Sequence, residues 1–295
     1  MAIYKRGLTV KILVTGGAGF IGSNLVDHLI EQDNDVLVVD NLTTGIKKNI
    51  NYRSSFSDFN VKDNWESNDA LKHYDPQVIY HLAALPRIAP SFKHPSEVLF
   101  VNCLGTVNML EYARLRKSKV IFAGSSSVEH DIYANPYSHS KYIAEQNCIM
   151  YNRVYGLSIA IARFFNVYGN RQILNGEFAN VIGIFESQII KNKPLTITGN
   201  GEQRRDFTYV GDICSGLLKM HEKNWNGEVF NLGRGKNYSI NEVAHMFKPS
   251  KIEYIPSRIG EAYETLADTS FSEKELNWKP KFDLSDYIEM FLHNL

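Results

Sequence analysis

Hydrophobic residues near the N-terminal end alternate between two patterns. Residues 10–15 and 36–40 are short runs rich in β-branched side chains, which is typical of buried strands. Between them, residues 21–32 carry hydrophobic side chains at helical spacing. The chain therefore predicts a βαβ unit, with a glycine-rich turn directly after its first strand.

The same alternation continues to about residue 165. Strands are expected at 77–82, 120–123 and 158–165, and helices at 96–116, with Ser96 as N-cap, and from about Pro136 to residue 155. Strands alternating with helices indicate an α/β fold with a Rossmann-like, doubly wound parallel sheet.

Beyond residue 166 the predicted elements are shorter. A helix is expected at 180–191, strands at 195–198 and 207–210, and a turn at 199–201. This change predicts two parts: a nucleotide-binding domain at 1–166 and a smaller mixed α/β lobe at 167–295. The boundary is soft, and the chain can cross between the lobes.

Charge and cysteine content exclude several classes of partner. Acidic and basic residues balance at 32 each, so no global field attracts the chain to nucleic acid or to an anionic membrane. Cys103, Cys148 and Cys214 lack CxxC spacing, which favours buried thiols over disulfides or a metal site. Residues 1–10 have no long apolar run, so neither a signal peptide nor a membrane span is expected. We expect a cytoplasmic protein without a metal.

The glycine-rich turn reads Gly16-Gly17-Ala18-Gly19-Phe20-Ile21-Gly22. Glycines at 16, 19 and 22 allow a tight turn, close approach of the backbone to a pyrophosphate, and close helix packing. The predicted strand before the turn and the helix after it provide the context that this motif requires. We therefore expect a dinucleotide here, with Phe20 and Ile21 in its site.

Asp40 closes the second predicted strand, 18 residues past Gly22. A carboxylate at this spacing accepts hydrogen bonds from the adenosine ribose and repels a 2′-phosphate. NAD is therefore expected rather than NADP, with Asn41 beside it. The alternatives are a turn or cap role for Asp40, and NADP binding aided by Lys47 and Lys48.

Tyr137 and Lys141 lie four residues apart on one predicted helix, so their side chains share a face. The ammonium, helped by the positive nicotinamide of bound NAD, is expected to lower the pKa of Tyr137 and make it a general base. Ser125, Ser126 and Ser127 follow a buried strand at the sheet edge where such folds bind ligands. A structural helix pair and an ordinary serine loop are the alternatives.

Together these motifs resemble the extended short-chain dehydrogenase/reductase family of NAD-dependent sugar epimerases and dehydratases. The similarity includes Thr15 with the glycine turn, His81-Leu82-Ala83-Ala84, the serine run and Tyr137-Ser138-His139-Ser140-Lys141. It continues through residues 163–169, 201–210 and 258–261, so about residues 9–281 are covered. The members most like this chain are the UDP-hexose 4-epimerases.

The resemblance implies a role for each matching residue. Catalysis falls to Ser125, Tyr137 and Lys141. It implies that Asp63 reaches the adenine, that Leu82, Ala83 and Ala84 line the nicotinamide pocket, that Asn102 helps to fix the cofactor, and that Phe164 brings an aromatic ring to it. Arg205 and Arg258 are expected to bind the diphosphate, with Asn166 and Asn180 beside it and Ser126 near the sugar. Guanidinium groups suit a phosphate pair held without a metal.

The run Ser125-Ser126-Ser127-Val128 distinguishes among reactions of this family. Dehydratases typically carry Thr-Asp-Glu there, and UDP-xylose-forming decarboxylases usually keep a glutamate at the position of Ser127. A carboxylate is missing from this run, so 4-epimerisation through a transient 4-keto sugar is expected. A dehydratase or reductase, and a binding protein with decayed catalysis, remain alternatives.

Two residues bear on the sugar. Thr265 matches a position where a bulky aromatic narrows the pocket of glucose-selective relatives, so a 2-N-acetyl group is expected to fit and the substrates to be UDP-GlcNAc/UDP-GalNAc, UDP-Glc/UDP-Gal, or both. Arg87 could instead approach a carboxylate, which keeps UDP-glucuronate open. His81 is interpreted as structural, and the loop after Val128 is shorter than usual. The resemblance also implies a homodimer through the helix of residues 97–116 and the Tyr137 helix.

Overall fold

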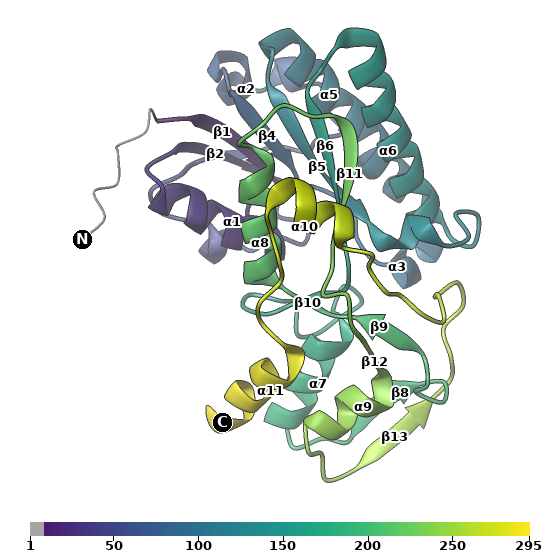
Figure 1. Cartoon of the computed structure of the whole chain (residues 1–295). Coiled ribbons are helices and arrows are strands. Elements are labelled where there is room, and N and C mark those ends of the chain that lie inside the picture. Colours follow the sequence, from purple (N-terminus) through teal and green to yellow (C-terminus); the bar gives the residue numbers. More distant parts are fainter. Residues whose placement is uncertain (1–8) are drawn as a thin grey trace.

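The computed structural model describes residues 9–295 and contains a seven-stranded parallel sheet (Figure 1). The prediction for residues 1–10 falls almost entirely outside this range. From one edge to the other the strands are β11 (Asn226–Leu232), β6 (Ile159–Phe164), β5 (Lys119–Ser125), β4 (Val78–His81), β1 (Lys11–Thr15), β2 (Asp35–Asp40) and β3 (Ser55–Asp58). The order reverses direction next to β1, as in a doubly wound fold, so the predicted fold class is confirmed.

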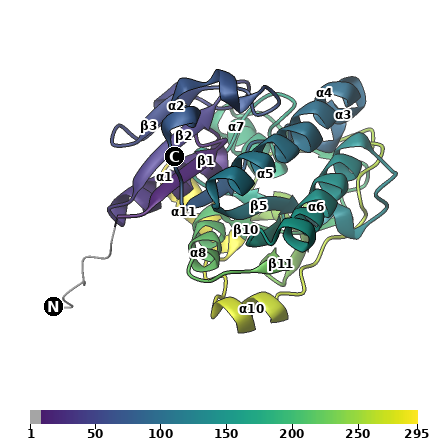
Figure 2. The same cartoon turned by 90° about the horizontal axis from the view of Figure 1, so that it is seen from above.

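Helices cover both faces of the sheet (Figures 1 and 2). One face packs on α1 (Phe20–Glu31), α8 (Val210–Met220) and α10 (Ser270–Leu276), and the other on α2 (Asp69–His73), α5 (Gly105–Arg116) and α6 (Pro136–Tyr155). Each face has its own hydrophobic cluster, because a strand covered on both sides must bury the side chains of both its faces. Two short helices, α3 (Ile88–Lys93) and α4 (Pro95–Leu99), connect β4 to α5.

The sheet is completed by residues from the C-terminal half of the chain. β11 pairs with β6 from Asn226↔Ile159 to Leu232↔Phe164, and α8 and α10 cover its face. Residues 167–295 therefore contribute to both parts of the molecule. The chain leaves the sheet after β6, builds part of the smaller lobe, and returns.

The smaller lobe lies below the sheet, next to the carboxyl ends of its strands (Figure 1). Its helices are α7 (Val181–Ile190), α9 (Ile240–Met246) and α11 (Leu284–His293), which share a third hydrophobic cluster. Its short strands pair two by two: β7 (Val167–Tyr168) with β10 (Thr208–Tyr209), β9 (Arg204–Asp206) with β12 (Asn237–Ser239), and β8 (Leu195–Thr198) with β13 (Ile252–Ile255).

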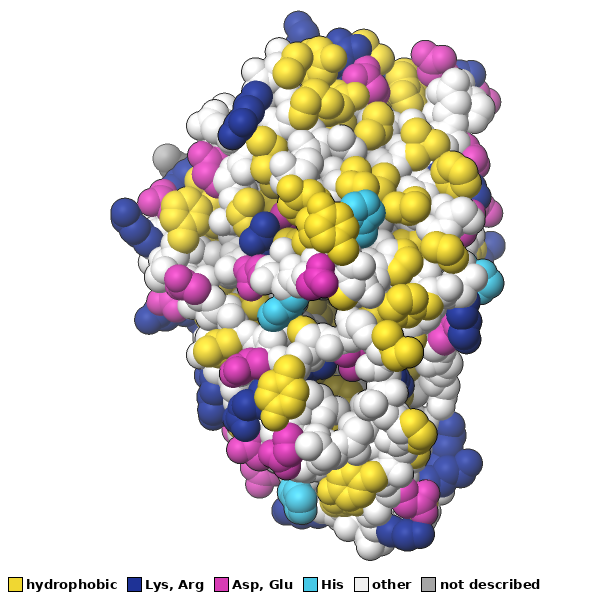
Figure 3. Space-filling model, turned by 90° about the vertical axis from the view of Figure 1, so that its right-hand side faces the viewer, with side chains coloured by type: hydrophobic (Ala, Val, Ile, Leu, Met, Phe, Trp, Pro, Cys, Tyr) yellow, Lys and Arg dark blue, Asp and Glu magenta, His cyan; other side chains and the backbone are white. Residues whose placement is uncertain are grey.

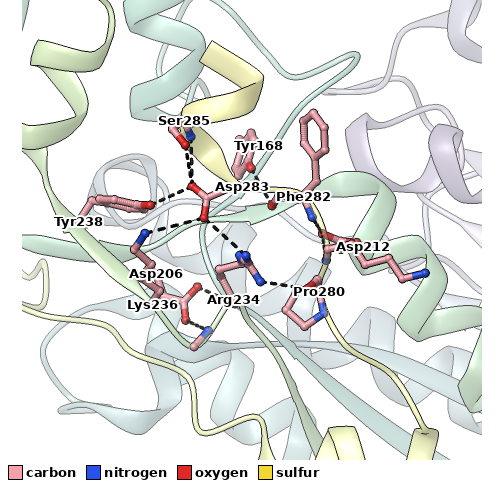
Figure 4. Close-up of polar contacts among 12 residues, drawn as sticks. Tyr168, Asp206, Asp212, Arg234, Lys236, Tyr238, Pro280, Phe282, Asp283 and Ser285 are labelled. Carbon is pink, nitrogen blue, oxygen red and sulfur yellow. Dashed lines mark hydrogen bonds and ion pairs between the residues drawn. The ribbon is translucent and has the colours of Figure 1, made fainter. Parts of the chain in front are cut away.

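A polar network fastens the C-terminal segment to this lobe (Figure 4). Asp283 caps α11 by accepting the N–H of Ser285, accepts the Tyr238 hydroxyl at 2.8 Å, and pairs with Arg234 at 3.5 Å. Asp212 accepts two backbone N–H groups, at residues 281 and 282, each at 2.9 Å. These contacts hold the last helix without a disulfide.

Two predicted elements are wrong in detail. Ser96 is not an N-cap: α4 begins at Pro95 with His94 in the cap position, and the helix then passes through a π-helical turn at Phe100–Leu104 before α5. The strand expected at 207–210 is only β10, because Val210 already begins α8. Pro95 occupies the first helical position of α4, which sets the start of that helix. β10 pairs with β7 only at Thr208 and Tyr209, which sets the length of that strand.

Two further features concern the side chains and the length of the helices. Cys148 and Cys214 are buried, whereas Cys103 is only partly buried, contrary to expectation.

Among residues 9–295, no helix has the length and hydropathy needed to cross a membrane. The same residues form no cluster of three or more His, Cys, Asp or Glu side chains suited to a metal.

Candidate functional site

A cavity of about 490 Å³ runs along the carboxyl ends of the strands and into the smaller lobe. Most of the predicted site residues line it: Gly16, Gly19, Phe20, Ile21, Gly22, Asp40, Asn41, Leu82, Ala83, Ala84, Arg87, Ser125, Ser126, Tyr137, Lys141, Phe164, Asn166, Asn180, Arg205, Arg258 and Thr265. The structure thus brings residues from both halves of the chain into one space. Such a position is where open α/β sheets bind ligands.

Two glycines of the turn, Gly16 and Gly22, have no room for a side chain. Gly16 has φ +72°, and a Cβ there would lie 2.8 Å from the nitrogen of Ala83. A Cβ on Gly22 would lie 2.1 Å from the carbonyl oxygen of Gly16. The turn leads directly into α1, and the first residues of this helix line the cavity. The free N–H groups at the start of a helix favour an anion. This cradle fits the pyrophosphate of NAD.

Asp40 has a structural role in addition to its place in the cavity. Its carboxylate accepts the N–H of Ala18 at 3.0 Å and that of Leu42 at 2.8 Å. Asp40 therefore ties the glycine turn to the loop after β2, which is the turn-forming alternative. Burial raises the pKa of this carboxyl, and the two N–H groups oppose that rise. Each oxygen keeps a lone pair free for a ribose hydroxyl.

Asp63 and Asn102 do not line the cavity. Asp63 is exposed, and the cavity wall near it is formed by Asn60 and Val61 instead. Asn102 is buried in the π-helical turn and makes two hydrogen bonds with the backbone of Leu85, at 2.8 and 3.1 Å. Asn102 therefore positions the loop after β4, and any effect on a cofactor acts through that loop.

Ser125 and Tyr137 meet at the end of β5. Both side chains line the cavity, and the Ser125 Oγ accepts the N–H of Ser127 at 3.2 Å and lies 3.0 Å from the Ser127 Oγ. The side chain of Asn135 caps α6 by accepting the Ser138 N–H, and Pro136 occupies its first turn. These contacts fix the start of the helix that carries Tyr137.

Burial dominates the electrostatics of Tyr137. It raises the pKa of the phenol, while the Ser125 hydroxyl and the charge of Arg87 lower it. The lowering expected from Lys141 together with bound NAD stays a prediction.

Lys141 is buried beneath the cavity. Its Nζ donates to the carbonyl of Ala123 at 2.6 Å and lies 4.7 Å from the centre of the Phe122 ring. Burial lowers the pKa of Lys141 to about 8, opposed chiefly by the charge of Glu145. When it is charged, the buried Lys141 ammonium therefore lowers the stability of the folded chain.

His81 is structural, as predicted. It is buried, with Nδ1 2.7 Å from the Thr15 hydroxyl and Nε2 3.1 Å from that of Thr106. Burial, aided by the charge of Lys141, lowers its pKa to about 3. The imidazole is neutral at physiological pH and links β4 to β1 and α5.

Glu261 joins the two predicted phosphate ligands. Its carboxylate lies 3.6 Å from the guanidinium of Arg205 and 3.6 Å from that of Arg258. Arg205 also donates to the carbonyls of Arg204 and Tyr263. The pair of arginines is thereby held side by side at one end of the cavity, where a diphosphate would satisfy the remaining donors.

The other predicted residues of the smaller lobe are already engaged. Asn166 donates to the Thr265 hydroxyl at 3.0 Å, and Thr265 also accepts the N–H of Asp206. Asn180 caps α7 and donates to Gln172 at 3.0 Å. Thr265 is small and held by these bonds, so the cavity beside it stays open.

Several cavity residues escaped prediction: Thr43, Thr44, Asn60, Val61, His130, Glu177, Phe178, Gln203 and Glu261. Glu261 lies in the 258–261 segment, whose resemblance could have indicated it. The loop residues had no periodic or motif signal.

Comparisons with known proteins agree with this geometry. The model of the NAD dependent epimerase/dehydratase family matches residues 12–233. A Methanocaldococcus jannaschii protein named "Putative UDP-glucose 4-epimerase" is 40% identical, covering 94% of this chain and 96% of its own.

Solved structures are also similar. UDP-glucose 4-epimerase of Thermotoga maritima, solved with UDP-glucose, is 31% identical with a TM-score of 0.90, over 96% of this chain and 97% of its own. UDP-glucuronic acid 4-epimerase of Bacillus cereus, solved with UDP-glucuronic acid and NAD, is 31% identical with a TM-score of 0.86, over 96% and 99%.

Proposed function

The chain belongs to the NAD-dependent epimerase/dehydratase family, and on this premise we propose that it is a 4-epimerase of a UDP-sugar that works through a transient 4-keto sugar. The names of the Methanocaldococcus, Thermotoga and Bacillus relatives support this choice over a dehydratase. NAD is the cofactor, retained between turnovers.

One observation carries the proposal: the side chains of Tyr137 and Ser125 line the same cavity, with serines and no carboxylate in the run 125–127. Elimination of water needs a further acid or base placed beside the sugar, and the serine hydroxyls do not supply one at neutral pH. Reversible oxidation at one carbon needs a single proton-transfer group. Tyr137 and Ser125 meet that need.

The proposed chemistry assigns one role to each of the side chains of Tyr137, Ser125 and Arg87. Tyr137 takes the proton of the sugar 4′-hydroxyl and later returns it, and Ser125 donates to the same oxygen. Arg87 favours the phenolate form of Tyr137. When bound, NAD would supply a reversible hydride acceptor for C4′. Return of the hydride to the other face of the sugar would restore the cofactor, so a turnover would consume no reductant.

The residues that would hold NAD are those of the sheet edge. The glycine turn and the start of α1 cradle the pyrophosphate, Asp40 receives the adenosine ribose, and residues 82–84 border the nicotinamide. Arg205 and Arg258, which Glu261 holds side by side, would bind the substrate diphosphate. The sugar then lies between this pair of arginines and Tyr137.

The cavity beside Thr265 bears on the C2′ substituent. Threonine is small, and its hydroxyl is bonded to Asn166 and Asp206. We infer that a 2-N-acetyl group is accepted, so that UDP-GlcNAc/UDP-GalNAc interconversion is at least as favoured as UDP-Glc/UDP-Gal. The group at C5′ is a separate matter, considered in the next subsection.

Exposed hydrophobic side chains support a homodimer. They lie along residues 95–116 and α6, which pack side by side, and Figure 3 shows hydrophobic side chains spread over the upper half of this side of the molecule. The residues are Leu99, Phe100, Leu104, Leu115, Met150, Val154 and Tyr155. Two copies would bury them as a four-helix bundle.

Sedimentation of the wild type should show a dimer. The variant Leu104→Glu should sediment as a monomer, whereas Ile190→Glu on α7 should remain dimeric. A monomeric wild type contradicts this arrangement.

The compartment is proposed from the cysteines. Cys103, Cys148 and Cys214 are all free thiols, which suits a reducing, cytoplasmic setting.

The test of the function uses purified protein without added cofactor. UDP-Glc, UDP-GlcNAc and UDP-GlcA are each supplied, products are identified by NMR, and absorbance reports reduced nicotinamide. We expect a 4′-epimer without net accumulation of NADH. Stoichiometric NADH would indicate a dehydrogenase instead, and neither product would indicate a binding protein.

A further inference from the structure

Arg87 has a backbone conformation that arginine rarely adopts. Its φ is +82° and its ψ is 142°. Left-handed residues normally have ψ near +45°, and the region that Arg87 occupies is essentially reserved for glycine. A side chain kept in such a conformation at a cavity wall indicates that its position serves the ligand.

The guanidinium of Arg87 is held at one point and free at the other. Nε donates to the carbonyl of Phe178 at 3.1 Å. Among residues 9–295, the two Nη groups make no hydrogen bond, and no carboxylate lies within 4.0 Å of them. The fork therefore presents two parallel N–H donors to the cavity, which is the arrangement that a carboxylate binds.

The nearby carboxylates are already paired. Glu177 lies 3.0 Å from Lys93, and Glu261 is shared between Arg205 and Arg258. Burial lowers the pKa of Arg87, and the largest charge that offsets this effect is that of Tyr137. Arg87 lines the same cavity as Ser125 and Tyr137, and a half-buried cation there is stabilised by an anion from outside the chain.

We propose that the sugar of the substrate carries a carboxylate, which the free face of the Arg87 guanidinium binds beside Ser125 and Tyr137. This inference rests on the proposed function and narrows its substrate to a nucleotide sugar of the uronate class. A carboxylate at C5′ extends from the ring on the side next to C4′. Arg87 would therefore hold the sugar where Tyr137 reaches the 4′-hydroxyl.

UDP-glucuronate and UDP-glucose form a matched pair of probes, because they differ at C6′ alone. Calorimetry with NAD-loaded protein measures the Kd of each and of UDP, and NMR measures kcat/KM. For the wild type we expect UDP-glucuronate to bind at least about 30-fold more tightly than UDP-glucose, as for a buried charge pair.

Arg87→Gly fits the backbone and should fold at least as well as the wild type. We expect it to weaken UDP-glucuronate by at least about 30-fold, with the Kd values of UDP-glucose and UDP within about 3-fold of wild type. The preference in kcat/KM should fall by the same factor, since any change at Tyr137 affects both sugars. Arg171→Gly is the matched control, because Arg171 also has a positive φ, 67°, and pairs with Asp27 away from the cavity.

Each outcome decides the matter. Equal binding of the two sugars by the wild type, or failure of both to bind, overturns the inference. So does an equal loss for UDP in Arg87→Gly, which would assign Arg87 to the diphosphate. A preference for the acid that Arg87→Gly abolishes, without any epimer formed, supports the inference and refutes the 4-epimerase proposal.

Discussion

The buried ammonium of Lys141 lowers the free energy of unfolding, and the size of this effect can be measured. Burial lowers its pKa from 10.5 to about 8, and in the unfolded chain the ammonium returns to its ordinary value. The difference corresponds to about 3 kcal/mol of stability that the folded chain gives up when Lys141 is charged. A residue kept under that penalty indicates a role outside folding.

The sign of the pH dependence follows from which state binds the proton. Between about pH 8 and 10.5 the unfolded chain holds a proton on Lys141 that the folded chain has released, so the free energy of unfolding rises with pH. The penalty is complete well below pH 8 and disappears above 10.5. Lys141→Met has a side chain of similar length and no titration. The wild type should therefore gain about 2 kcal/mol relative to Lys141→Met between about pH 7 and pH 9.5.

Urea unfolding of nucleotide-free protein at these two pH values measures the effect. Lys141 also acts on His81, but that imidazole, with a pKa of about 3, is neutral at both pH values, so the difference between the curves reports Lys141. Lys274→Met is the control, because the Lys274 side chain is 82% exposed, and it should follow the wild type at both pH values. Parallel pH dependences for Lys141→Met and the wild type would refute the reasoning.

Three further variants test other parts of the site and fold. Tyr137→Phe removes the proton-transfer group and should lower turnover at least about 10²-fold without loss of UDP-sugar binding; near-normal turnover in the NMR assay would rule out the role. Gly22→Ala places a Cβ 2.1 Å from the Gly16 oxygen and should weaken NAD at least about 10-fold by calorimetry, whereas Gly176→Ala, which meets nothing within 4 Å, should not; equal affinities contradict the cradle. Glu186 is buried with its pKa raised by burial and Oε1 lacking a partner among residues 9–295. Its contribution to stability therefore falls as pH rises past 4.5, so Glu186→Gln should flatten the decline of the urea midpoint from pH 4.5 toward 7, and an unchanged slope would refute this.

Local spacing was sufficient to predict the glycine turn and the Tyr137 helix. Both depend on contacts within a few residues of each other: Gly16 with Gly22, and Tyr137 with the cap at Asn135. The chemistry of the turn is also local, because the start of α1 supplies its own N–H groups. Motifs of this kind can be read from sequence without knowledge of the remaining fold.

Pairing between distant segments could not be predicted in this way. β3 reads Ser-Phe-Ser-Asp and has no strand pattern, yet it forms because β2 offers it a free edge. β11 was not predicted, and α8 was given no bounds although Cys214 lies in an apolar helical pattern. The position of β11 depends on its partner strand β6 rather than on its own periodicity.

The electrostatics of the site show the same limit. Sequence placed Lys141 on the same helix face as Tyr137, but it did not reveal that the ammonium donates to the carbonyl of Ala123. Arg87, which does act on the phenol, comes from a loop whose left-handed backbone no sequence pattern reveals. Burial and direction of each side chain are products of the assembled fold.

The pairing of β6 with β11 has a consequence for biosynthesis. As the chain emerges, the edge of β6 remains open until residue 232 has been made, because its parallel partner lies 67 residues further along from Ile159 to Asn226. An unprotected edge of this kind recruits other strands. A nascent or truncated product ending near residue 166 would thus depend on chaperones, and a shortened protein that contains the nucleotide-binding half must extend through β11 to remain monodisperse.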